Sequence, residues 1–174
     1  MNSKKLFIWV EGPDDVRFFE AIIKPKFLRK YCFVEVRQYA DMKKGKLCSF
    51  VKSIIAMGGD YIFSGDINQA PCVNIRKEKL RERYNILDEN RIIIIIKEIE
   101  SWYLAGITND FARKYKIKLA NRTEQIVKEQ FKKLIPKKFD SKTDFLVEIL
   151  KIFSTIEAMG KNTSFKYLID KYNL

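Results

Sequence analysis

The sequence has no histidine, only three cysteines and no long hydrophobic run. Without histidine, the Ser-His-Asp and Cys-His mechanisms, the H-E-x-x-H zinc site and an imidazole general base are all excluded. Cys32, Cys48 and Cys72 form no C-x-x-C pair, which argues against a disulfide framework or a cysteine-rich zinc site. If this protein hydrolyses a substrate, oxygen ligands and a metal ion are the natural route.

No apolar stretch approaches the roughly 18 residues that a membrane span needs. The densest apolar run, residues 91–99, contains Lys97 and Glu98. The N-terminal sequence MNSKKLFIWVEG has a short apolar run before a Gly-Pro turn, too short for the apolar region of a secretory signal. These features favour a cytoplasmic protein without a membrane partner.

Basic residues outnumber acidic ones, 34 to 22, which gives a net charge of +12. They cluster at residues 24–30, 43–46, 76–83, 113–118 and 128–138. Such a balance favours polyanionic partners, because lysine and arginine that neutralise phosphates release counterions. Solvated helix faces in a lysine-rich chain would give the same composition, so charge alone leaves both interpretations open.

The first two-thirds of the chain alternates predicted strands with predicted helices. Short apolar or alternating runs predict strands at residues 6–10, 33–39, 61–63 and 92–96, and helical spacing predicts helices from residue 14 and over 46–57, 76–87 and 100–105. Five consecutive isoleucines at 92–96 are typical of a strand buried on both faces. This order predicts an α/β fold with a mostly parallel sheet of about four strands flanked by helices.

Beyond residue 107 the pattern predicts only helices. They are expected at residues 109–115, 123–134, 142–153 and 164–172, with Thr123 and Ser141 as candidate caps. The sequence therefore predicts an α/β domain at residues 1–107 and a C-terminal helical extension at 108–174 packed on it.

Acidic residues follow three of the predicted strands. Glu11 follows the first, Asp66 the third and Glu98 the fourth. Because the carboxyl ends of parallel strands lie at one edge of a sheet, these three side chains are expected to converge on one divalent ion. Further candidate ligands close by in the sequence are Asp15, Asn68 and Glu100.

Several carboxylates in one place repel each other unless a cation is present. Mg²⁺ or Mn²⁺, with about six oxygen ligands including waters, would relieve that repulsion and polarise a phosphoryl oxygen. Glu11, Asp66 and Glu98 are thus the candidate catalytic residues. Lysines and arginines would hold a nucleic-acid strand, and the candidates are Arg76, Lys77, Lys43 and Lys44.

Each of these residues also has a purely structural interpretation. Asp15 and Glu100 would suit the first turn of a helix, where carboxylates meet the positive end of the dipole. Asp66 would suit a turn, and Arg76 and Lys77 a solvated helix face. Trp102 would suit the core better than a base-stacking role.

Three segments together resemble the Toprim-like family. Residues 6–15, LFIWVEGPDD, resemble its first motif, a strand ending in Glu-Gly with an acidic residue four positions after the Glu. Residues 64–68, SGDIN, resemble the S-x-D-x-D motif of the overcoming-lysogenization-defect type Toprim nucleases. Residues 96–105, IKEIESWYLA, look like the E-I-E-x-W-x-L-A signature of small stand-alone bacterial and archaeal Toprim-like proteins.

The resemblance covers roughly residues 5–107, and residues 161–165, KNTSF, look like a recurrent segment of the same group. It implies a Toprim-like fold, Mg²⁺ binding, and cleavage or strand manipulation of DNA or RNA in phage defence or DNA repair. It also implies a partner protein such as an ATPase. Asn68 departs from the family pattern, because it stands where a second Asp is usual.

Two functions of other classes stay open. One is a nucleic-acid-binding or regulatory module that uses the Toprim-like scaffold without cutting, which the neutral amide of Asn68 supports. The other is a small nucleotide- or phosphate-binding protein, which ranks last because no G-x-G-x-x-G or G-x-x-x-x-G-K-[ST] motif is present.

Overall fold

The computed structural model describes residues 4–174 and contains two compact units. The first unit ends at Ile94 and the second comprises Ile95–Leu174. The division therefore falls before the predicted boundary at residue 107. The helix predicted at residues 100–105 belongs to the second unit rather than to the α/β unit.

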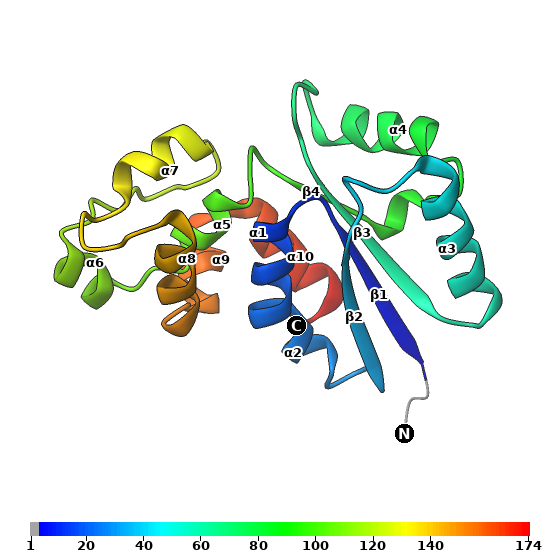
Figure 1. The fold of residues 1–174 in the computed structure, drawn as a ribbon, viewed down its shortest axis with the longest axis horizontal. Coiled ribbons are helices and arrows are strands. Elements are labelled where there is room, and N and C mark those ends of the chain that lie inside the picture. Colours follow the sequence, from blue (N-terminus) through cyan, green and yellow to red (C-terminus); the bar gives the residue numbers. More distant parts are fainter. Residues whose placement is uncertain (1–3) are drawn as a thin grey trace. The chain divides into compact units, whose positions relative to one another are not determined.

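A four-stranded, all-parallel sheet forms the centre of the first unit, as predicted (Figure 1). Its strands are β1 (Lys5–Val10), β2 (Phe33–Gln38), β3 (Asp60–Asp66) and β4 (Ile92–Ile95), in the order β2-β1-β3-β4. Strand β1 pairs with both β2 and β3, and Trp9 lies opposite Arg37 on one side and Phe63 on the other. The carboxyl ends of these strands consequently lie at one edge.

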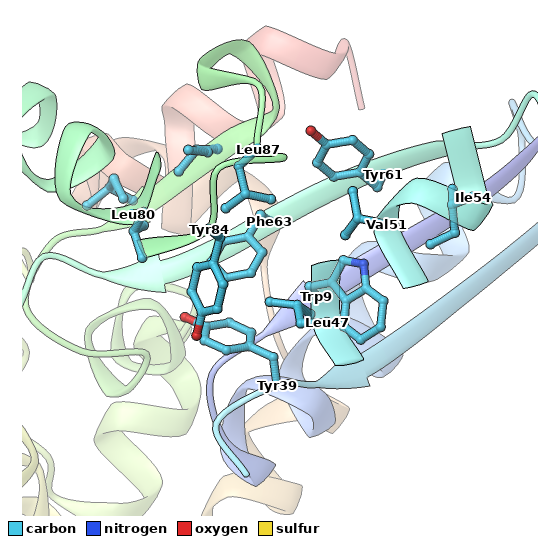
Figure 2. Packing of buried hydrophobic residues seen from close by; sticks show 12 residues of the cluster. Trp9, Tyr39, Leu47, Val51, Ile54, Tyr61, Phe63, Leu80, Tyr84 and Leu87 are labelled. Carbon is cyan, nitrogen blue, oxygen red and sulfur yellow. The ribbon is translucent and has the colours of Figure 1, made fainter. Parts of the chain in front are cut away.

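Helices α3 (Lys44–Ala56) and α4 (Val73–Arg83) pack on one face of this sheet. Figure 2 shows Trp9, Tyr61 and Phe63 of the strands packed with Val51 of α3 and Leu80 of α4. These side chains alternate along each strand with residues of the opposite face, as the period of two requires. Each of these strands thus contributes one row of side chains to this apolar layer.

The chain between β1 and β2 is helical throughout. It consists of α1 (Pro13–Phe18), a π-helical turn η1 (Phe19–Ile23) and α2 (Lys24–Phe27), and a short 3₁₀ turn η2 (Glu89–Arg91) precedes β4. Phe18, Phe19, Ile23 and Phe27 are all buried. The helix predicted to open near Asp14 is confirmed, although the π-helical turn was not predicted.

The end of strand β3 differs from its prediction. Ser64, Gly65 and Asp66 were expected to follow a strand at 61–63, but they are the last three residues of β3. Serine and glycine are common in turns, which is why the strand was predicted to end early. Here Ser64 and Gly65 are buried, and their small size lets the strand continue beneath neighbouring side chains.

The second unit is entirely helical after the end of β4. Its helices are α5 (Glu100–Ala105), α6 (Asn109–Tyr115), α7 (Lys128–Leu134), α8 (Lys142–Lys151), α9 (Thr155–Lys161) and α10 (Thr163–Tyr172). The bounds of α6 and the Ser141 cap of α8 are confirmed, since the Asp144 backbone N–H donates to the Ser141 hydroxyl at 3.1 Å. Across residues 4–174, no helix is both long and apolar enough to cross a membrane.

One prediction for this unit is wrong, and one helix was missed. Thr123 does not cap a helix, because α7 begins only at Lys128, and the Thr123 hydroxyl instead donates to the Lys161 carbonyl at 3.4 Å. Helix α9 was not predicted at all, although Ser154 caps it by accepting from the Glu157 backbone N–H. Gly160 lies inside α9, although glycine weakens a helix interior.

A buried polar network joins the helices of the second unit. Asn162, which has no exposed surface, caps α10 by accepting from the Phe165 backbone N–H at 3.0 Å. Its amide nitrogen donates to the hydroxyls of Ser101 and Thr123, at 3.3 and 3.1 Å. The indole of Trp102 donates to the Ser164 hydroxyl at 2.8 Å, so Trp102 is a core residue as expected.

Candidate metal site at the strand ends

The first unit brings Glu11 and Asp66 together. Glu11 directly follows β1, and Asp66 ends the neighbouring strand β3. The Asp66 backbone N–H donates to Glu11 Oε2 at 3.2 Å. Both residues are partly buried, so two carboxylates share one edge of the sheet with limited access to water.

Tyr39 is a third member of this site that the sequence did not indicate. Its hydroxyl donates to Glu11 Oε2 at 3.5 Å, and its ring packs on Phe63 with centroids 4.3 Å apart. Burial, with the negative charge of Glu11 as a further cause, raises the pKa of Tyr39 well above its usual range. Tyr39 therefore stays protonated at neutral pH and acts as a hydrogen-bond donor to the carboxylate.

Gly65 makes this arrangement possible. A Cβ atom at position 65 would lie 2.8 Å from the Tyr39 hydroxyl and 3.8 Å from Glu11 Oε2. Because Tyr39 is held between Phe63 and Tyr84, its ring cannot easily move aside (Figure 2). The absence of a side chain at position 65 therefore lets the tyrosine reach the carboxylate.

Asp15 is buried beside the same turn. Its Oδ2 accepts from the Gly12 backbone N–H at 3.2 Å, so the carboxylate closes the first turn of α1. This contact supports the structural interpretation of Asp15. Its role as a metal ligand stays a prediction.

Basic residues border the loop that follows Asp66. The Arg76 Nε donates to the Asp66 carbonyl at 2.7 Å. A pocket of about 370 Å³ lies here, and its lining includes Asn68, Arg76 and Lys79. The exposed Asn68 has a left-handed backbone with φ of 50°, so its neutral side chain lies on a tight turn at the pocket.

The other predicted phosphate contacts differ in exposure. Lys43 and Lys44 are exposed at the start of α3 and remain available to solvent. Lys77 is only 9% exposed, so neither a solvated helix face nor an open phosphate contact describes it. The helical period places Lys77 toward the body of the unit, whereas Lys79 lines the pocket instead.

Glu98 and Glu100 belong to the second unit, where lysines engage both. Glu98 accepts from the Lys128 backbone N–H, and its carboxylate lies 3.9 Å from the Lys128 ammonium. Glu100 is buried, and the Lys142 ammonium lies 2.6 Å from its Oε1. The convergence of Glu98 with Glu11 and Asp66 stays a prediction.

The chemistry of the Glu11–Asp66 pair fits a magnesium ion. Within residues 4–174, no three His, Cys, Asp or Glu side chains gather into a group that would enclose a metal. Mg²⁺ commonly binds through one or two carboxylates, several waters and a substrate phosphate rather than through a complete protein cage. Glu11 and Asp66, which meet at neighbouring strand ends beside a basic pocket, are residues of the type that requirement calls for.

No family model, curated protein or solved structure matches the chain. The resemblance to Toprim-like proteins therefore stays a hypothesis that rests on the three sequence motifs.

Proposed function

We propose that the protein is a Mg²⁺-dependent, Toprim-like nuclease that acts on the phosphodiesters of DNA or RNA. The observation that carries the proposal is the contact between Glu11 and the end of β3, which places two carboxylates at neighbouring strand ends. On the grounds of the sequence we also propose a cytoplasmic location and a role in phage defence or DNA repair. A partner protein such as an ATPase belongs to the same proposal.

The residues of the first unit have separate roles in this proposal. Glu11 and Asp66 would hold the ion, and bound Mg²⁺ would supply Lewis-acid polarisation of a phosphodiester. Tyr39 orients Glu11 by donating to it, and it leaves the other carboxylate oxygen available. Arg76 is fixed by the Asp66 carbonyl, so its remaining guanidinium N–H groups can bind a phosphate at the pocket.

Metal binding is the first test of this proposal. Titration calorimetry with Mn²⁺ should give a binding isotherm for the wild-type chain that is lost in Glu11→Gln and in Asp66→Asn. Glu20→Gln is the matched control, because Glu20 is a surface carboxylate paired with Lys24 on the helix. Equal Mn²⁺ binding by Glu11→Gln and the control would refute the metal site.

Cleavage is the second test. Purified protein should cut plasmid, single-stranded DNA or RNA in Mg²⁺ or Mn²⁺, but not in EDTA, and Glu11→Gln should lose at least a hundredfold in rate. Glu98→Gln tests the predicted third ligand. If that variant binds Mn²⁺ and cuts like the wild type, Glu98 does not belong to the site.

The second candidate function is a Toprim-like module that binds nucleic acid without cutting it. Two observations favour it: lysines of the second unit already neutralise Glu98 and Glu100, and the amide of Asn68 is neutral. It predicts salt-sensitive binding that survives Glu11→Gln. Absence of cleavage by the wild type together with its gain in Asn68→Asp would support this candidate against the nuclease.

A further inference from the structure

A dense run of positive charge lies in the second unit. Residues 113–142 contain eleven lysines and arginines but only three acidic residues, a net charge of +8. Lys116, Lys118 and Lys133 are exposed, and in the part of the chain that the structure describes they form no ion pair. Their charges are therefore available to an external anion.

The chain in this segment is not a continuous helix, and the loop that interrupts it leaves a hollow in the surface. Helix α6 ends at Tyr115. Its C-cap residue Lys116 has a left-handed backbone with φ of 55°, and the Ile117 N–H donates to the Ala112 carbonyl at 2.9 Å. No helix resumes until Lys128. The intervening residues 117–127 run as a loop between α6 and α7.

Two cavities are lined by residues of this loop and share Lys118 and Leu119 in their walls. The smaller, of about 280 Å³, has an apolar lining that includes Leu104, Leu119 and Leu134. The polar side chains that line the same cavity include Lys118, Gln130 and Lys133.

The larger cavity, of about 700 Å³, is wide and more basic. Arg113, Lys116 and Lys118 line it together with Ile117 and Leu119. The two cavities thus combine an apolar recess with a wide, open basic surface beside it. A single-stranded nucleic acid matches this combination. Its unpaired bases have apolar π-faces that can be buried, and its backbone carries a row of phosphates.

We infer that this hollow binds single-stranded nucleic acid, with one base in the smaller cavity and the adjoining phosphates on Lys118, Lys133 and the larger cavity. The inference rests on the proposed nucleic-acid substrate, and it gives the helical unit the task of holding the strand. A duplex binds less well, because its bases are stacked and paired and cannot enter the recess. Gln130 also lines the smaller cavity, and its Oε1 accepts from the Val127 backbone N–H at 3.1 Å, so its amide NH₂ is the group that would donate to the base edge.

The test is fluorescence anisotropy of the full chain with a labelled oligo-dT of about twelve nucleotides, in EDTA and over a range of salt. In Lys118→Ala/Lys133→Ala, the slope of log affinity against log salt should become less negative by about 1.4, since each lost phosphate contact on a single strand removes about 0.7. Lys166→Ala/Lys171→Ala is the control, with the same loss of charge on α10. An equal change in both double variants would overturn the inference.

The base recess has its own test. Ala120→Phe fills the smaller cavity from an exposed position and leaves every charge in place. It should weaken oligo-dT binding roughly tenfold or more, without changing the salt slope or the binding of an abasic strand of equal length. Ala120→Leu should give a smaller loss in the same direction, and circular dichroism confirms that both variants fold.

Three outcomes would overturn the inference: equal wild-type affinity for the abasic strand and oligo-dT, duplex bound as tightly as single strand, or unchanged oligo-dT binding in Ala120→Phe. Binding of phosphatidylserine vesicles that depends on Lys118 and Lys133, with strand binding that does not, would assign the surface to a membrane and also overturn it. Because the anisotropy assay is run in EDTA, it measures strand binding separately from metal-dependent cleavage. Strand binding in EDTA together with no cleavage in Mg²⁺ or Mn²⁺ would refute only the nuclease. Cleavage at a rate that does not depend on Lys118 and Lys133 would refute only the proposed strand-binding site.

Discussion

Asn162 offers the sharpest test of how the second unit is held together. The substitution Asn162→Ala removes a side chain that makes four hydrogen bonds without any exposed surface. Its Oδ1 accepts from the Ser164 hydroxyl at 2.8 Å and from the Phe165 backbone N–H at 3.0 Å. Its Nδ2 donates to Ser101 and Thr123, so the residue links the start of α10 to two other segments.

The size of the effect follows from these contacts. Loss of the helix cap costs about 1 kcal/mol. The Ser164 hydroxyl would become a buried donor without its acceptor, which costs about 1–3 kcal/mol. The two acceptors on Ser101 and Thr123 lose less, because both hydroxyls also donate to backbone carbonyls. A loss of about 4 kcal/mol in the free energy of unfolding is therefore expected, a large fraction of the stability of an ordinary domain.

The two tryptophans let the two units be observed separately, since Trp9 lies in the first unit and Trp102 in the second. In a Trp9→Phe background, the remaining fluorescence comes from Trp102, whose ring packs against Phe165 with centroids 5.3 Å apart. Urea unfolding followed by this signal should show a midpoint lowered by roughly 2 M in Asn162→Ala. The exposed Asn109, at the start of α6, provides the control Asn109→Ala, with a change within about 0.5 kcal/mol.

Two results would contradict this prediction for Asn162→Ala. If Asn162→Ala lowered the free energy of unfolding by less than about 1 kcal/mol, the buried network would not form as described. If Asn162→Ala greatly lowered the urea midpoint that Trp9 reports in a Trp102→Phe background, but hardly changed the midpoint that Trp102 reports, the effect would lie in the wrong unit. Ser101→Ala should give a smaller loss than Asn162→Ala, because it removes only one of the four contacts.

Two further predictions concern the first unit, and both are measured by the urea midpoint that Trp9 reports. Gly65→Ala should destabilise the unit by about 1–3 kcal/mol and weaken Mn²⁺ binding, because the added methyl would lie 2.8 Å from a buried tyrosine hydroxyl. Gly45→Ala is the control, because a Cβ atom at this position of α3 would meet no atom within 4 Å. This variant should stabilise the unit by about 0.5–1 kcal/mol, and equal effects at positions 45 and 65 would contradict the argument. For Asp60, burial opposes ionisation, but hydrogen bonds from Lys4 and Arg91 outweigh it and lower the pKa below its usual 3.8. The stability advantage of wild type over Asp60→Asn should therefore be constant above about pH 5 and shrink as the pH falls below about 4, and an advantage that grows in acid would refute the assignment.

Much of the α/β unit could be predicted because its signals are local. Runs of apolar residues separated by turn formers gave all four strands within a few residues, and their alternation with helices predicted the parallel sheet. The error at the end of β3 arose because Ser64 and Gly65 also occur in turns, and only packing against Tyr39 shows that they continue a strand.

The helical unit was harder to predict, because its helices are short and depend on distant partners. Helix α9 contains Gly160, and the start of α7 is fixed by contacts that no local pattern contains. The role of Asn162 was equally hidden, since its hydrogen bonds reach residues 39 and 61 positions earlier in the chain. A polar residue between two short helices has no signature that distinguishes it from an exposed cap.

The sequence by itself determined the sheet, and with it the meeting of Glu11 and Asp66, because residues that end adjacent parallel strands must share an edge. Only the tertiary structure decided what surrounds those carboxylates, namely the hydroxyl of Tyr39 and the space left by Gly65. It also showed that Lys128 engages Glu98 within the second unit. The physical reason is one of range. Apolar periodicity records whether a residue is buried, whereas the partner of a polar group depends on segments that only folding brings near.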